Sequence, residues 1–192
     1  MELSAIGYRV SGMWIRAGAV ALGALLVALA AQVSIPLPGT PVPMTLQPMA
    51  VLLVGGLLGA RLGALSMILY LAMGAAGLPV FTPTVPLPGI ARLLGPTGGY
   101  LLAYPVVAWV TGWLTPGWQP GVNKPWLRTA LALVAGLLLI HLGGLAQLAI
   151  LTGDISSAAR LATWPFLLGD LLKLAILVPV LTKLTPAVRA RL

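Results

Sequence analysis

Charged residues are absent from long stretches of this 192-residue chain, and the apolar runs between them set its organisation. No charged side chain occurs from Ala17 to Ala60, which is long enough for two membrane-spanning helices of about 20 residues each. Four prolines between Ile35 and Pro43 interrupt this stretch, and such a cluster cannot form an ordinary helix interior. We therefore expect one helix before this proline-rich segment and another after it.

The same reasoning applied to the whole chain predicts six transmembrane helices. Arg61 marks a turn between the second and third helices, and a second proline-rich segment extends from Pro79 to Thr97. A short polar loop containing Asp154 precedes the last helix. The predicted helices cover residues 13–33, 44–59, 62–78, 98–114, 129–151 and 164–183. The sequence thus predicts one all-α integral membrane domain over residues 1–192.

The composition supports this class. Hydrophobic residues make up 59% of the chain and charged residues only 7%, whereas soluble domains average about 25% charged residues. A chain this poor in charge has too few polar side chains to cover a soluble core. The run from Ala17 to Val33 is longer than the apolar region of a signal peptide, and we interpret it as a retained first helix.

The basic residues predict the orientation. A net charge of +8 would suggest nucleic acid as the partner of a soluble domain, but here the basic residues stand singly between apolar runs. With the N-terminus inside, the outer loops hold only Arg92 and Arg160. The inner regions hold Arg9, Arg16, Arg61, Lys124, Arg128, Lys183, Arg189 and Arg191. The positive-inside rule therefore places both termini in the cytoplasm and both proline-rich segments outside, as ordered loops. Because the basic residues are explained by this topology, we expect no nucleic-acid partner.

The last predicted helix carries the candidate chemistry. Asp170 and Lys173 share one helix face well inside the span, where ionised side chains are costly and usually face a cavity. They could anchor a ligand or form a self-neutralising pair that only fixes helix packing. His141 is expected to hydrogen bond between helices. Gln47 could donate to a ligand or cap backbone left open by the prolines.

The residues do not favour an enzyme. The chain has no cysteine and a single histidine, which excludes thiol nucleophiles and histidine-based metal clusters. Asp154 and Asp170 each follow a glycine, but they lie close in sequence and Asp154 is in a predicted loop. This arrangement does not match an intramembrane aspartyl protease.

The first helix is rich in small residues at four-residue spacing, which allows another helix to approach closely in lipid. These residues are Ala17, Ala21, Ala24 and Ala28. The chain contains no Gly-x4-Gly-Lys-Ser/Thr motif, so ATP-driven transport would need other chains.

Several short motifs occur together and in order. They are Pro41-Val-Pro-Met-Thr-Leu-Gln47, Val54-Gly-Gly-Leu-Leu-Gly59, Gly77-Leu-Pro-Val-Phe81, Gly95-Pro-Thr-Gly-Gly-Tyr-Leu101 and Gly169-Asp-x-x-Lys173. Over residues 17–183 the chain thereby resembles the BioY family, the biotin-specific S components of energy-coupling-factor (ECF) vitamin transporters.

This resemblance implies a six-helix subunit that lies in the plasma membrane of a prokaryote and captures biotin from outside the cell. Such a subunit does not hydrolyse ATP; a transmembrane T protein and two ABC-type ATPases energise transport. Small residues of the first helix contact the T protein in the family, which would be the role of the four alanines. The aspartate and lysine of the last motif contribute to the biotin site, which implies Asp170 and Lys173.

The chemistry of biotin suits these residues. Asp170 can accept hydrogen bonds from the two ureido N–H groups, and Lys173 or Gln47 can donate to the ureido carbonyl. Some relatives carry an arginine after Gly-Gly-Tyr where this chain has Leu101, and Arg92 is then the nearest cation for the carboxylate, with Lys173 as the other choice. The aromatic residues expected to pack on the fused rings are Phe81, Tyr100 and Trp164.

Two other interpretations stay open at this stage. The chain could be an S component for another small vitamin. It could also be a structural or channel-like membrane protein in which Asp170 and Lys173 only hold helices together.

Overall fold

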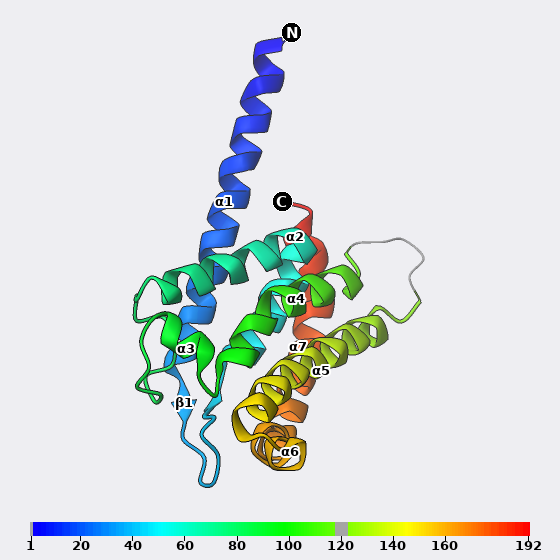
Figure 1. Ribbon diagram of the computed structural model, residues 1–192. Coiled ribbons are helices and arrows are strands. Elements are labelled where there is room, and N and C mark those ends of the chain that lie inside the picture. The colour runs from blue at the N-terminus through cyan, green and yellow to red at the C-terminus, as the bar shows by residue number, and fades with distance from the viewer. Residues whose placement is uncertain (1, 118–122) are drawn as a thin grey trace.

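The computed structural model describes residues 2–117 and 123–192, with side chains from residue 12 onward. Helices dominate the described residues, and a two-stranded hairpin joins the first two long helices (Figure 1). In chain order the elements are α1 Glu2–Gln32, β1 Ser34–Ile35, β2 Met44–Thr45, α2 Gln47–Ala75, α3 Ile90–Leu94, α4 Gly98–Leu114, α5 Pro125–Thr152, α6 Ile155–Ala162, the 3-10 turn η1 Trp164–Phe166 and α7 Leu167–Arg189.

Four stretches of the described residues are long and apolar enough to cross a membrane. They are Gly12–Gln32, Gln47–Ala75, Pro125–Thr152 and Ile155–Arg189. α4 has 17 residues and is not among them. The mostly helical architecture with four candidate spans agrees with the prediction apart from the short hairpin, whereas the count of six spans stays a prediction.

α2 contains the two helices that we expected as separate segments on either side of Arg61. The backbone of Gly59 leaves the helical conformation, with φ 83° and ψ 175°, and divides α2 into two parts. A positive φ is strained for residues that have a Cβ, so glycine fixes the position of this break. The chain therefore changes direction two residues before Arg61, and α2 ends at Ala75 rather than at residue 78.

Two short helices replace segments that we predicted as irregular. α3 lies inside the second proline-rich segment, and α6 occupies the predicted polar loop after the fifth helix. Asp154 starts α6 as its N-cap, because its carboxylate accepts hydrogen bonds from the backbone N–H groups of Ser156 at 3.2 Å and Ser157 at 2.7 Å. Hydrogen bonds from Ser157 and then Ser156 lower the pKa of this carboxyl below its ordinary value. The polar residues of this segment therefore begin a helix.

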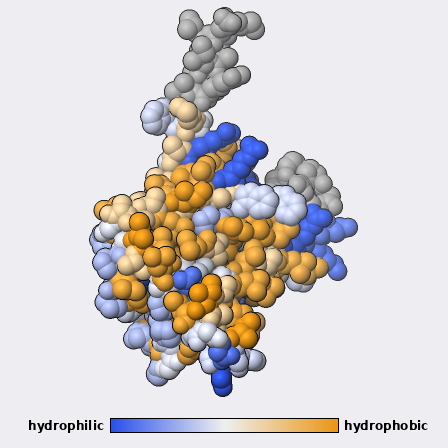
Figure 2. Space-filling view, viewed as in Figure 1, coloured by the Kyte–Doolittle hydropathy of each residue, from blue (hydrophilic) through white to orange (hydrophobic). Residues whose placement is uncertain are grey.

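The first proline-rich segment forms the loop of the hairpin, in which Ser34 pairs with Thr45 and Ile35 with Met44. Figure 1 shows the hairpin, α6 and the start of α7 at one end of the molecule, and both termini at the opposite end. Between these ends the face seen in Figure 2 is largely hydrophobic. Many large apolar side chains of the chain, such as Trp14, Leu138 and Ile176, are exposed, as expected for side chains that face lipid.

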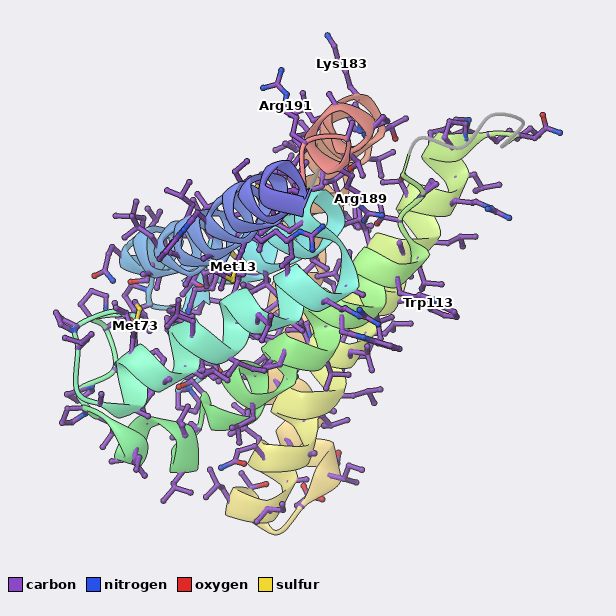
Figure 3. All side chains as sticks on the ribbon, turned by 90° about the horizontal axis from the view of Figure 1, so that it is seen from above. Met13, Met73, Trp113, Lys183, Arg189 and Arg191 are labelled. Carbon is purple, nitrogen blue, oxygen red and sulfur yellow. The ribbon has the colours of Figure 1, made fainter. Side chains whose placement is uncertain are left out.

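Glycines bring α4 close to its neighbours. Gly99 of α4 and Gly143 of α5 face each other, and a Cβ on either would overlap the backbone of the other helix. At the end that carries the termini, Arg189 points inward, whereas Lys183 and Arg191 point away from the helices (Figure 3). Arg189 donates to the carbonyls of Gly56 at 2.7 Å and Gly112 at 2.9 Å, and so ties α7 to α2 and α4 next to the break. This packing fixes α7, which carries Asp170 and Lys173 near its other end.

Candidate ligand-binding site

A pocket lies between the hairpin, α3 and the adjoining ends or middles of α2, α4, α5 and α7. The cavity volume is about 50 Å³, below the about 300–1,000 Å³ typical of occupied small-molecule sites, so a ligand of vitamin size requires the wall to open. The wall is mostly apolar and holds a few ionisable groups. The lining residues are Val42, Pro43, Thr45, Gln47, Pro48, Phe81, Thr82, Arg92, Thr97, Tyr100, Leu101, Tyr104, Ile140, His141, Phe166, Asp170 and Lys173.

Three ionisable side chains form a buried cluster on one wall. The Lys173 ammonium donates to Asp170 Oδ1 at 2.9 Å, and the two residues are one helical turn apart on α7. The other carboxylate oxygen, Oδ2, lies 2.7 Å from Nε2 of His141 on α5. His141 therefore joins two helices through a hydrogen bond, as predicted. The sequence did not reveal that its partner is Asp170, which makes His141 part of the candidate site.

Arg92 is the other cation of the pocket, and only 3% of it is exposed. The surrounding loop holds its side chain: Nε donates to Leu87 O at 3.0 Å, and Nη2 donates to Thr82 O at 2.6 Å and to Val85 O. Burial lowers the pKa of the Arg92 guanidinium, which stays protonated because an arginine side chain does not lose its charge in proteins. Nη1 is buried and has no hydrogen-bond partner. The pocket thus contains a fixed positive charge with an unused donor.

The aromatic residues of the pocket are held by their own contacts. The Tyr100 hydroxyl donates to the carbonyl of Ala162 at 2.6 Å, and its ring packs edge-on against Phe166 with centroids 6.5 Å apart. Phe81 packs edge-on against Tyr70 at 5.5 Å. Tyr100, Phe166 and Phe81 thus contribute apolar ring surface to the cavity wall.

The amide of Gln47 is already engaged on both sides. Its nitrogen donates to the Tyr70 hydroxyl at 2.6 Å, and its oxygen accepts from the Thr45 hydroxyl at 3.2 Å. Gln47 therefore lines the pocket and also links Thr45 of the pocket wall to Tyr70 of the core. A direct contact with a ligand would use the remaining hydrogen-bonding capacity of the amide.

The pocket brings together six of the seven residues that the sequence suggested for ligand binding, and Trp164 is the exception. Trp164 is 68% exposed in η1 and does not line the cavity. Phe166, two residues later, occupies the corresponding part of the wall and is buried. The 3-10 turn explains the exchange, since it rotates the start of the last helix relative to a regular α-helix.

Thr97 is a pocket residue that the sequence analysis did not identify. Its hydroxyl is buried and has no hydrogen-bond partner. A buried polar atom without a partner is costly, and its presence in a pocket wall is typical of a group that a ligand or water satisfies. Its position directly before Gly98-Gly-Tyr100 is the one sequence signal that could have identified it.

The alanines of α1 divide into two groups. Ala17 and Ala21 are exposed, whereas Ala24 and Ala28 belong to the core of the chain. The neighbouring Gly23 lies against Ser66 and Val54 of α2, which shows what this face of α1 contacts. Ala24 and Ala28 serve close packing within the chain, so the structure removes them from the predicted docking surface.

The comparisons with known proteins come from sequence and from structure. The BioY family profile matches residues 10–190, nearly the whole chain. The chain belongs to the BioY family. A probable biotin transporter BioY of Pyrococcus horikoshii is 40% identical over 156 residues, 81% of this chain and 87% of the relative. The biotin transporter BioY of Thermotoga maritima is 37% identical over 151 residues, 79% of this chain and 84% of the relative.

A solved structure shares the fold. The crystal structure of the S-component for biotin from an ECF-type ABC transporter superposes with a TM-score of 0.77, covering 93% of this chain and 92% of that one at 24% identity. The relatives of this family are named as transporters and not as enzymes, in agreement with the interpretation of this chain as a non-enzyme. Family membership also places the chain among prokaryotic membrane proteins.

Proposed function

We propose that this chain is the high-affinity biotin-binding S component of an ECF-type importer in the plasma membrane of a prokaryote. Its family and the names of its relatives support biotin as the ligand, and the pocket holds polar and aromatic groups that suit biotin. The observation that carries the proposal is that one apolar pocket is lined both by the buried carboxylate of Asp170 and by the buried guanidinium of Arg92, whose Nη1 has no hydrogen-bond partner.

The ureido group of biotin is the part that Asp170 would bind. An ionised carboxylate has about four acceptor positions, of which the contacts with Lys173 and His141 use two. The remaining positions can accept the ureido N–H groups. The Lys173 ammonium has three N–H donors and donates one to Asp170, so another can donate to the ureido carbonyl. Hydrogen bonds with ionised partners are about twice as strong as neutral ones.

The carboxylate end of biotin would meet Arg92. Backbone carbonyls already hold two of its three nitrogens, so the guanidinium needs no reordering to receive an anion through Nη1. A preordered group loses little conformational entropy on binding. The apolar rings and thioether would lie against Tyr100, Phe81 and Phe166 between the two polar ends.

The proposed topology has six membrane crossings with both termini in the cytoplasm. Both termini lie at one end of the molecule, which requires an even number of crossings (Figure 1). The break at Gly59 lets the two parts of α2 run in different directions and count as two short crossings, and α4 would provide another. The excess of lysine and arginine near the terminal end supports a cytoplasmic location of that end.

Transport would need a T protein and two ABC-type ATPases. The exposed small residues Ala17 and Ala21 of α1 remain the proposed contact with the T protein, since they allow close helix approach in lipid. Movement of the bound biotin across the membrane would then depend on these partners.

Ligand identity is tested by competition. The purified chain in detergent is loaded with labelled biotin and challenged with unlabelled biotin, thiamine or riboflavin. We expect displacement by unlabelled biotin alone. Displacement by another vitamin at lower concentration than biotin would assign the pocket to that vitamin.

The two proline-rich loops are expected to cover the bound ligand. The chain has no cysteine, so single cysteines can be introduced at the exposed positions Pro38 and Pro86, with Lys183 at the other end of the molecule as the control. Biotin should slow thiol labelling at the two loop positions and leave the control unchanged. Equal labelling rates with and without biotin would show that the loops do not close.

A further inference from the structure

The first residue of α4 is a threonine that does not cap its helix. Thr97 is the N-cap, a position where threonine is preferred because its oxygen accepts from the free N–H groups of the first turn. In this chain the Thr97 side chain makes no cap hydrogen bond. Its hydroxyl has no other partner among the described residues, although only 7% of the residue is exposed.

The N-cap of α6 shows the difference. Asp154 has an extended backbone, with φ −140° and ψ 121°, and its carboxylate accepts from the N–H groups of Ser156 and Ser157. The backbone of Thr97 is helical instead, with φ −95° and ψ −3°. A capping residue typically has an extended backbone, which directs its side chain back to the helix. The Thr97 hydroxyl and the first N–H groups of α4 are therefore not paired with each other.

The face of α4 that lines the pocket starts at this threonine. The lining residues from this segment are Thr97, Tyr100, Leu101 and Tyr104. Their three- and four-residue spacing places them on one helix face. The first N–H groups of a helix have no partner within it and together carry about half a positive charge. This part of the pocket wall therefore combines a buried hydroxyl with a helix N-terminus.

Arg92 belongs to the same part of the wall. α3, which carries it, packs directly against the start of α4, where a Cβ on Gly98 would overlap the carbonyl of Leu93. Arg92 is buried, lines the pocket and has no hydrogen-bond partner for Nη1. One short stretch of chain thus supplies two buried polar groups without partners to the pocket wall. Such groups are costly unless something satisfies them, and here a ligand can do so.

We infer that Thr97 determines specificity for an acidic ligand: its hydroxyl, the N–H groups at the start of α4 and Nη1 of Arg92 form the subsite for the ligand carboxylate. All three can donate, and an ionised carboxylate only accepts. Helix N-termini stabilise anions, and charged acceptors form the stronger hydrogen bonds. This inference deepens the proposed function and rests on it for biotin as the acid.

Thr97→Val tests the hydroxyl, because valine keeps the branched shape and removes the donor. We expect the purified variant to bind biotin about tenfold more weakly than wild type, as for loss of a charge-assisted hydrogen bond. The uncharged biotin amide should weaken by about threefold or less, since hydrogen bonds to neutral acceptors are about half as strong. Thr97→Ser keeps the hydroxyl and should bind biotin nearly as wild type does.

Thr111→Val is the matched control. Thr111 lies on the same helix, is fully buried and has a hydroxyl without a partner, but it does not line the pocket. Its valine variant should bind biotin with unchanged affinity. Without ligand, neither valine variant should unfold at a lower temperature than wild type, because each removes a buried polar atom that makes no hydrogen bond.

Unchanged biotin affinity in Thr97→Val would overturn the inference, and so would equal losses for biotin and its amide. A lower unfolding temperature of unliganded Thr97→Val would also overturn it, since the hydroxyl would then hold the fold. If the folded wild-type chain binds no biotin, the proposed function fails and the inference falls with it. Binding by wild type therefore separates the two failures.

Discussion

Replacing Arg92 with glutamine separates the two roles that the structure gives to this side chain. Arg92 holds the second proline-rich loop through the carbonyls of Thr82, Val85 and Leu87, and its buried Nη1, which has no hydrogen-bond partner, is the donor that we propose for the ligand carboxylate. Loss of the loop contacts should weaken every ligand equally. Loss of the charge should weaken only a ligand that carries a carboxylate.

The magnitude follows from the charge-assisted contact. A hydrogen bond to a charged group contributes about 1.5–3 kcal/mol, and a tenfold change in affinity corresponds to about 1.4 kcal/mol. Arg92→Gln should therefore weaken biotin by about 10- to 150-fold more than it weakens the uncharged biotin amide. Arg92→Lys keeps the charge but not the planar group that the three carbonyls hold, and should lie between wild type and Arg92→Gln.

The assay is equilibrium binding of both ligands to wild type and to each variant in the same detergent. Thermal unfolding of each unliganded variant serves as the folding control. If Arg92→Gln lowers the affinity for biotin and for the amide by the same factor, Arg92 acts only on the loop and the carboxylate binds elsewhere.

Three further predictions concern packing, aromatic contacts and docking. A Cβ at position 144 would overlap the Tyr100 ring, so Gly144→Ala should cost about 1–3 kcal/mol and lower the unfolding temperature; an unchanged temperature would show that the ring moves freely. Phe166→Leu should weaken biotin about threefold to tenfold, whereas the exposed Trp164→Leu should bind normally, and equal losses would contradict the placement of η1. Ala21→Trp should leave biotin binding intact but reduce co-purification with the T protein and ATPases, and normal assembly would place the docking surface elsewhere.

The helical architecture could be predicted because charge and proline leave unambiguous signals in an apolar chain. The run from Ala17 to Ala60 with its proline cluster located the connection between the first two helices, though not its hairpin strands, and Arg61 located the turn in α2 to within two residues. The sequence does not predict α6, because the polar residues of this segment favour a loop. Asp154 is nevertheless a local helix-start signal that the sequence contains, since aspartate is a preferred N-cap.

The part of the site that lies on a single helix could be predicted from residue spacing. Asp170 and Lys173 stand one turn apart on α7, so their spacing alone revealed a shared face. His141 and Thr97 come from other helices, and only tertiary packing shows that they face the same pocket. The burial of Ala24 was also unpredictable, because small residues at four-residue spacing suit an internal helix contact as well as an external one.

The most direct test of the account is equilibrium titration of the isolated, purified chain with labelled biotin, compared with Asp170→Asn. Circular dichroism and a single gel-filtration peak would establish that both proteins are folded. We predict saturable binding of one biotin per wild-type chain, and at least about tenfold weaker binding by the variant, since a charged acceptor for the ureido group is lost. Absence of saturable binding by the folded wild-type chain, or equal affinity of wild type and Asp170→Asn, would contradict the account.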